Sequence, residues 1–342
     1  MTNNRTRNII RLALLIGTIG SLFTVPWIIV WAWILPVPDT IQEQVEEALN
    51  YGFEGVIVYV DKADETPAFY TAGYHNSEEK IPANPDALFK IASISKLYVA
   101  VAITKLVHNQ QLDLDQTLLD YFPELDGRIA YANEITLRMM VQHRSGIPNY
   151  TDQENFWIAP PTTAQETLEL IFDLPATFKP GKGYAYSNTN YLLLRELIKK
   201  TVGYSSHQYI KEEILMPLGL NNTFGSLSEV DTNKVMSGYY VGYDDDLKTT
   251  EQGMLATAQD VGVFLRALND GTVFKAGEQA IYSSIYVYEH TGLVPGYQSI
   301  AKYHKEMDAV LVQFTNVTNF EGYNWNLSEV VYGRIVKILE RK

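Results

Sequence analysis

The sequence contains no cysteine among its 342 residues. This absence excludes disulfides, cysteine nucleophiles and thiolate metal ligands, and it is compatible with any redox compartment. An excess of basic residues is also missing, because 40 Asp and Glu residues outnumber 27 Lys and Arg residues and give a net charge of −13. Binding to nucleic acid depends on basic residues that contact the phosphate backbone. The net negative charge of this chain therefore makes nucleic acid an unexpected partner.

Motifs for metals and nucleotides are missing as well. The sequence has neither a glycine-rich phosphate loop nor a His-Glu-x-x-His motif. Five of the six histidines are scattered along the chain without metal-ligand spacing: His75, His108, His143, His207 and His304. We therefore expect no metal site and no cofactor.

One long uncharged run is present near the N-terminus. Residues 12–35 are 24 consecutive residues without a charge, and as a helix they would rise about 36 Å, enough to cross a hydrocarbon core of about 30 Å. Three arginines precede the run in residues 1–11, and acidic residues follow it. Because basic flanks stay in the cytoplasm, we expect a short cytoplasmic tail at 1–11, a single-pass cell-membrane anchor at 12–35 and an extracytoplasmic domain at 39–342.

The run has two further features. Pro26 lies within it and is expected to kink the helix, while Trp27, Trp31 and Trp33 lie toward its outer end, where interfacial aromatic residues belong. A cleaved signal peptide is the alternative interpretation. Its apolar core usually has about 7–15 residues and ends in a small-x-small site, whereas this run is longer and is not followed by a clear Ala-x-Ala site.

Strand-like and helix-like segments alternate unevenly along the remaining chain. Runs rich in Val, Ile and Tyr predict strands near both ends, at 56–60, 68–74, 284–289, 297–303 and 309–316. Helical patterns are expected at 41–50, 89–107 and 327–339, and they dominate residues 110–252. The simplest arrangement is an α+β fold: an antiparallel sheet flanked by helices, built from residues 39–109 and 253–342, with an all-helical subdomain inserted at 110–252.

The segment Ser93-Ile94-Ser95-Lys96 carries the strongest chemical signal. On a helix, Ser93 and Lys96 lie on one face about one turn apart. The surrounding segment is apolar, so Lys96 is expected to be buried, and burial lowers the pKa of an amine toward a form that accepts a proton. The alternative is a surface lysine whose charged end reaches solvent.

The segment Tyr186-Ser187-Asn188 follows a Lys-Pro-Gly turn and precedes an apolar helical pattern. Tyr186 on such a loop could face Ser93 and share its proton with Lys96. The alternative is that Asn188 or Asn190 simply caps the helix.

The segment His290-Thr291-Gly292 follows a predicted strand. Gly292 would let a substrate backbone lie close to the strand edge, Thr291 offers a hydroxyl to a carboxylate or carbonyl, and His290 is titratable. The alternative is an ordinary strand end with an incidental histidine.

In this order, the three motifs resemble those of the serine β-lactamase and penicillin-binding-protein superfamily. The resemblance is greatest to its class C branch, which includes D-alanyl-D-alanine carboxypeptidases and esterases, and it spans about residues 45–342. Four further segments are similar to that branch: residues 142–147, 180–191, 216–220 and 253–257.

The resemblance implies a β-lactamase/transpeptidase-like fold and an acyl-enzyme mechanism. By position it implies these roles: Ser93 as nucleophile, Lys96 and Tyr186 as general base and acid, Asn188 orienting the acyl group, His290, Thr291 and Gly292 lining the opposite wall, and the backbone N–H groups of Ser93 and Leu293 as oxyanion hole.

Three departures from the branch bear on the substrate. His290 stands where class C β-lactamases carry lysine, Leu293 stands where a small residue is common, and the interval from Tyr186 to His290 is short. The expected function is a membrane-anchored hydrolase that acts on small-molecule or peptidoglycan-type substrates, namely D-alanyl peptides or esters of the cell envelope. The alternatives are an antibiotic-hydrolysing β-lactamase and a catalytically quiet binding protein on the same fold.

Overall fold

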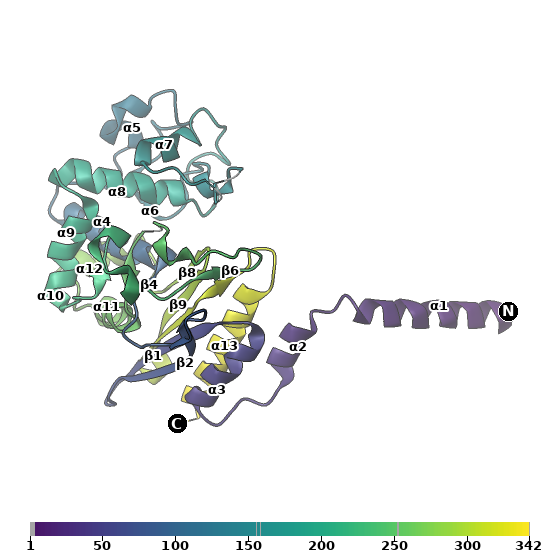
Figure 1. Cartoon of the computed structure of the whole chain (residues 1–342). Helices are drawn as coiled ribbons and strands as arrows, with labels where there is room; N and C mark the ends of the chain where they lie inside the picture. The colour runs from purple at the N-terminus through teal and green to yellow at the C-terminus, as the bar shows by residue number, and fades with distance from the viewer. Residues whose placement is uncertain (1–3, 155, 158, 252, 342) are drawn as a thin grey trace.

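The computed structural model describes residues 4–341 apart from 155, 158 and 252. Its centre is a six-stranded sheet in the order β3-β2-β1-β10-β9-β8, with every neighbouring pair antiparallel. The strands are β1 (Gly55–Lys62), β2 (Ala68–Asn76), β3 (Ile81–Pro82), β8 (His290–Val294), β9 (Tyr297–His304) and β10 (Ala309–Thr315). Strands from both ends of the domain meet where β1 pairs with β10, which confirms the expected antiparallel sheet (Figure 1).

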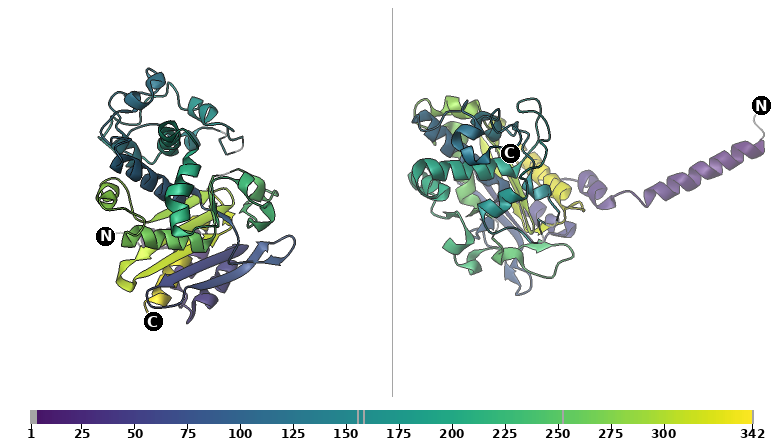
Figure 2. Two further views of the ribbon diagram at one scale, coloured as in Figure 1. Left: turned by 90° about the vertical axis from the view of Figure 1, so that its left-hand side faces the viewer. Right: turned by 90° about the horizontal axis from the view of Figure 1, so that it is seen from above.

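Alternation along β1 builds two apolar layers, because successive side chains of a strand point to opposite faces. Ile57 and Tyr59 join the larger core cluster on one face, whereas Val56, Val58 and Val60 join a second cluster on the other. The helices α4 (Ser95–His108) and α11 (Ala258–Asp270) contribute to the first cluster, and α3 (Ile41–Ala48) and α13 (Asn324–Leu339) to the second. The sheet is therefore covered on both faces (Figures 1 and 2).

The expected insert, residues 110–252, forms most of the upper part of the molecule in Figure 1. Its helices are α5 (Leu118–Tyr121), α6 (Leu137–Val141), α7 (Ala164–Glu169), α8 (Asn188–Val202), α9 (Ser206–Ile210) and α10 (Met216–Leu218), with a π-helical turn at Lys211–Leu215. The expectation of an all-helical insert is wrong in one detail, because this segment also contains β5 (Thr223–Phe224) and β6 (Tyr239–Tyr240). β5 pairs with β7 (Leu255–Ala256), which also pairs with β4 (Phe89–Lys90), and β6 pairs with β11 (Val317–Thr318).

Two predicted elements near the motifs are also corrected. The helix expected over 89–107 is interrupted, because β4 takes its first two residues and a 3-10 turn, Ala92–Ile94, precedes α4. The strand expected over 284–289 does not form. α12 (Glu278–Ser283) ends just before it, and backbone bonds from Ile285 and Tyr286 to the Tyr282 carbonyl turn the chain instead.

The apolar N-terminal run forms two helices. α1 (Asn4–Leu22) projects from the domain, and α2 (Trp27–Ile34) follows after a bend of 79° (Figures 1 and 2). Within the described residues, no single helix is long and apolar enough to cross a membrane, although the bent pair passes that test jointly. The expected single transmembrane helix over 12–35 is therefore not formed. The chain breaks beside Pro26, where a kink was expected, because proline lacks an N–H group and disfavours helical backbone in the residue before it.

Candidate active site

Ser93 lies on the short turn that connects β4 to α4. Ala92, immediately before it, has φ +49, a left-handed backbone that is uncommon for a residue with a side chain. The turn is held by bonds from the Ile91 N–H to the Met254 carbonyl and from the Ile94 N–H to the Ile91 carbonyl, each 3.1 Å. Such strained turns are concentrated at functional sites, where they present one side chain in a defined direction.

Lys96 is buried one helical turn after Ser93, with only 5% of its surface exposed, as the apolar segment predicts. Its Nζ lies 3.1 Å from Ser93 Oγ and 2.7 Å from Asn188 Oδ1. Burial lowers the pKa of the Lys96 amine well below its ordinary value, and the nearby positive charge of Arg195 lowers it further. The lowered pKa favours the uncharged amine, which is the form that can accept a proton from Ser93.

Tyr186 approaches Ser93 from the helical part of the molecule. Its phenolic O–H group donates a hydrogen bond of 2.7 Å to Ser93 Oγ, and its ring centroid lies 4.9 Å from Lys96 Nζ. Burial raises the pKa of Tyr186 above its ordinary value. The phenol is therefore protonated at neutral pH and acts as a donor, which leaves Lys96 as the basic member of the pair.

Asn188 is the first residue of α8, but its side chain does not cap that helix. Its Oδ1 accepts from Lys96, while its Nδ2 donates to Thr151 Oγ1 at 3.2 Å. The capping interpretation is therefore wrong for Asn188. Asn190 lies fully buried inside α8, where its Oδ1 accepts from Ser145 Oγ at 2.7 Å.

The strand β8 forms the opposite wall and is the edge strand of the sheet. At Gly292, a Cβ atom would overlap the Ser299 hydroxyl and lie 2.5 Å from the Ile91 carbonyl oxygen. A glycine is needed at this position because β8 packs directly against the turn that carries Ser93. The structure thus brings His290, Thr291 and Gly292 to the same site as Ser93, and the assignment of an oxyanion hole to Ser93 and Leu293 stays a prediction.

The family model described as Beta-lactamase matches residues 37–333. The chain belongs to the beta-lactamase family. Its resemblance to the serine β-lactamase and penicillin-binding-protein superfamily is therefore confirmed.

Curated relatives include a penicillin-binding protein of Bacillus subtilis (strain 168), 28% identical over 181 residues, and Protein flp of Staphylococcus aureus (strain MW2), 30% identical over 152 residues. These matches cover 51% and 44% of this chain, but only 38% and 30% of the two relatives. The chain therefore matches well under half the length of each of these relatives.

Solved structures with the same fold include a D-amino acid amidase from Ochrobactrum anthropi SV3, with a TM-score of 0.77 at 24% identity, covering 88% of this chain and 97% of that chain. A penicillin binding protein from Bacillus halodurans has a TM-score of 0.74 at 20% identity, covering 87% of this chain and 98% of that chain. At these identities, both comparisons support the fold alone.

His143 is a site residue that the sequence analysis of this beta-lactamase family member did not single out. Its ring stacks on Tyr186 with centroids 4.4 Å apart, and its Nδ1 accepts from the Ser187 N–H at 3.1 Å. Burial lowers the pKa of His143 to about 3, with a further contribution from Lys96, so the ring is neutral. His143 thereby fixes the loop that carries Tyr186. The sequence indicated its importance through its position in residues 142–147, a segment similar to the class C branch.

Arg195 is a second such residue. It lies seven residues after Asn188 on α8, which places the two on the same face of that helix, and its Nη2 donates to Ser95 Oγ at 2.9 Å. Its positive charge lies near Lys96 and disfavours a second positive charge there. The seven-residue spacing could have indicated this placement, but the pairing of α8 with α4 could not be read from the sequence.

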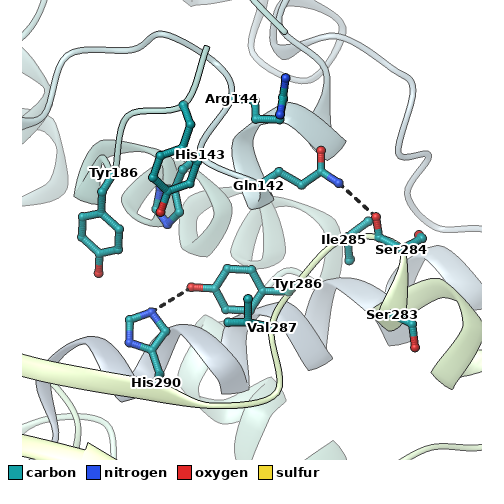
Figure 3. Close-up of a pocket in the computed structure, with 11 residues that line it drawn as sticks. Gln142, His143, Arg144, Tyr186, Ser283, Ser284, Ile285, Tyr286, Val287 and His290 are labelled. Carbon is teal, nitrogen blue, oxygen red and sulfur yellow. Dashed lines mark hydrogen bonds between the residues drawn. The ribbon is translucent and has the colours of Figure 1, made fainter. Parts of the chain in front are cut away.

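A cleft of about 510 Å³ adjoins the site and is lined by Tyr186, His290, His143 and Tyr286, among others (Figure 3). His290 Nε2 lies 3.1 Å from the Tyr286 hydroxyl. Burial lowers the pKa of His290 to about 4, so this side chain is uncharged at neutral pH, unlike a lysine at the same position. The charged residue among those that line the cleft is Arg144. Among the residues that the structure describes, no cluster of three or more potential metal ligands occurs.

Proposed function

We propose that this protein is a serine hydrolase that forms an acyl-enzyme on Ser93. The observation that supports it most is the placement of Ser93 Oγ between a buried amine at 3.1 Å and a phenol at 2.7 Å. A nucleophile within hydrogen-bond reach of its base is the usual arrangement in covalent catalysis.

In the proposed acylation step, Lys96 Nζ accepts the hydroxyl proton of Ser93 while Oγ attacks the substrate carbonyl carbon. The new C–O bond places negative charge on the carbonyl oxygen, which backbone N–H groups at Ser93 and Leu293 would stabilise. When the bond to the leaving group breaks, Tyr186 donates its proton to the departing nitrogen or oxygen. The Lys96 ammonium then returns a proton to Tyr186, which restores both groups and leaves the ester.

In the proposed deacylation step, water attacks the ester carbonyl, and the uncharged Lys96–Tyr186 pair accepts its proton. Breakage of the ester bond returns a proton to Ser93 and releases the acid. Asn188, already bonded to Lys96, would orient both the amine and the acyl group through its side-chain amide.

The proposed substrates are D-alanyl peptides or esters of the cell envelope. The names of the relatives support this class, since they include a penicillin-binding protein and a D-amino acid amidase, the latter also solved with D-phenylalanine. His290 supports it as well, because class C β-lactamases, which the resemblance sets apart from the carboxypeptidase and esterase members, carry lysine at this position.

We further propose that the N-terminal segment attaches the protein to the cell membrane, with the hydrolase domain on the outer face. Basic residues before the apolar run and acidic residues after it support this orientation. Protease protection of the full chain in sealed cells would test it. The domain should be digested from outside, and protection of the domain would contradict the orientation.

Intact-mass spectrometry of the full chain tests the enzymatic proposal. The protein is incubated in parallel with penicillin, a D-alanyl peptide and a p-nitrophenyl ester, and Ser93→Ala is the matched control. A covalent adduct on the native protein that is absent from Ser93→Ala is the expected result. Steady nitrocefin turnover without peptide or ester hydrolysis would favour the β-lactamase alternative, and no adduct with any probe would favour the binding-protein alternative.

A further inference from the structure

One face of α2 packs against the domain and is bound to it by hydrogen bonds. Ala32 is fully buried, and Ile29 packs against the same apolar cluster as α13. Arg334 of α13 donates hydrogen bonds to the carbonyl oxygens at the end of α2, at 3.1 Å to Ala32, 2.8 Å to Leu35 and 2.8 Å to Pro36. A cation is favourable at the carbonyl end of a helix. Figure 1 shows α2 alongside α13 as a result.

The remaining donors of Arg334 strengthen this attachment. Its Nε donates to Gln44 Oε1 and its Nη2 to Glu47 Oε2 at 3.1 Å. All five N–H groups of the guanidinium therefore have an acceptor. The direction of α2 relative to the domain is consequently defined by a buried hydrogen-bond network as well as by apolar contact.

The opposite face of α2 is apolar and exposed. Trp27, Trp31 and Ile34 are 43%, 51% and 61% exposed, and their spacing of four and three residues places them on one helix face. Tryptophan is enriched where proteins meet the boundary between lipid headgroups and hydrocarbon. The helix thus has one face bound to protein and one face suited to that boundary.

The neighbouring helix α1 indicates what covers this face. Its exposed apolar residues surround the helix on all sides: Ile9, Ile10, Leu12, Leu14, Leu15, Ile16, Ile19 and Leu22. A second copy of the chain would bury only one stripe of such a helix, whereas lipid covers its whole circumference. The exposed face of α2 is continuous in sequence with this surface.

The bend between the two helices is stabilised by side chains. The Trp27 indole N–H donates to the Leu22 carbonyl at 2.8 Å, and Thr24 Oγ1 donates to the Ser21 carbonyl at 2.8 Å. Carbonyls at a helix end require such partners where water is scarce. The 79° angle is therefore a defined feature of this segment.

We infer that α2 lies flat in the headgroup boundary of a phospholipid bilayer while α1 enters the hydrocarbon, so that Arg334 holds the hydrolase domain against the membrane in one orientation. This inference rests on the proposed attachment of the N-terminal segment to a membrane and adds its geometry. It does not rest on the proposed side of the membrane, because α1 by itself does not pass the length and hydropathy test for a span. It does not depend on the chemistry at Ser93.

Depth-dependent fluorescence quenching tests it in the full chain, reconstituted into phosphatidylcholine vesicles with bromine at shallow or deep acyl positions. Trp31 and Trp33 are changed to Phe, whereas Trp27 is kept because its indole N–H stabilises the bend. Ile34→Trp or Leu14→Trp is then added singly, and the quenching of the added tryptophan is obtained by difference. The signal of the domain tryptophans, Trp157 and Trp325, is subtracted. Trp27 and Ile34→Trp are seven residues apart on one face, so they differ in depth by about 10 Å if α2 crosses the bilayer and hardly at all if it lies flat.

The expected result is deep quenching of Leu14→Trp and equal, shallow quenching of the two α2 positions. A depth difference near 10 Å between the α2 positions would overturn the inference but leave the anchor intact. No quenching at the α2 positions, with deep quenching at Leu14→Trp, would likewise overturn the inference alone. Absence of quenching at all three positions would overturn both the inference and the proposed attachment.

Discussion

Two buried lysines on α4, nine residues apart, have opposite surroundings. Lys105 Nζ lies 3.0 Å from the carboxylate of Glu278 and 3.1 Å from the Val273 carbonyl oxygen. Lys96 Nζ contacts only the neutral side chains of Ser93 and Asn188 through hydrogen bonds. Both side chains are at most 5% exposed, so burial alone does not distinguish them.

The difference between the two lysines is the counter-charge. A buried ion pair compensates each partner for its lost hydration, whereas a buried amine without a carboxylate avoids the penalty by staying neutral. Glu278 therefore makes Lys105 a structural residue, and the positive charge of Arg195 near Lys96 favours the neutral form there. One helix can thus carry both a structural lysine and a candidate catalytic base.

The largest expected effect comes from Lys96→Met. Removal of the base should slow acylation of Ser93 by at least about 10³-fold, within the range for general-base catalysis. The free energy of unfolding should change by about 1 kcal/mol or less, because the lost hydrogen bonds are offset by removal of an unpaired buried amine. Single-turnover mass spectrometry measures the first quantity and denaturant unfolding the second. A variant that keeps its acylation rate would contradict the assignment of Lys96.

Tyr186→Phe should have the next largest effect. Loss of the phenolic donor at 2.7 Å from Ser93 Oγ should slow acylation by about 10²-fold while leaving Ser93 and Lys96 in place. The loss should be smaller for substrates whose leaving group needs no proton, such as a p-nitrophenyl ester. Equal losses for the ester and for a D-alanyl amide would argue against Tyr186 as the proton donor.

Lys105→Met tests the structural role of Lys105. This change leaves the Glu278 carboxylate buried without its cation and should lower the free energy of unfolding by about 3–5 kcal/mol. The acylation rate at a temperature where the variant is folded should remain within a few-fold of the original. The double variant Lys105→Met with Glu278→Leu should recover much of the stability, because it removes both charges.

Arg195→Gln should have the smallest effect and a characteristic pH dependence. Acylation needs the neutral amine, so its rate should rise with pH through the pKa of Lys96 and then level off. Removal of the Arg195 charge raises that pKa, and the acid limb of the profile should move to higher pH while the plateau is retained. Arg128→Gln, which alters a surface ion pair with Asp173, is the matched control and should leave the profile unchanged.

Parts of this site could be predicted from the sequence because they are local. Ser93 and Lys96 are one helical turn apart, and the apolar residues around Lys96 predict its burial without any knowledge of the fold. Likewise, the Val, Ile and Tyr residues at 56–60 predict a strand, and β1 forms there.

Other parts depend on contacts that are distant in sequence. The distance from Tyr186 to Ser93 depends on how the helical insert packs on the sheet, and the stacking of His143 on Tyr186 joins two loops 43 residues apart. The turn at 284–289 formed instead of a strand because bonds to Tyr282 compete with strand pairing. The N-terminal run forms two helices instead of one. The break depends on Pro26 and on the indole hydrogen bond of Trp27, whose combined effect on the helix could not be predicted from the sequence.

The ionisation state of Lys96 is measured most directly by NMR titration of the protein labelled with ¹³C at lysine Cε. The Lys96 signal is identified by its loss in Lys96→Met. A titration midpoint well below that of an ordinary lysine, with the chemical shift of a neutral amine above the midpoint, is the predicted result. An ammonium signal at pH 7 that titrates near the ordinary lysine pKa of about 10.4 would contradict the account.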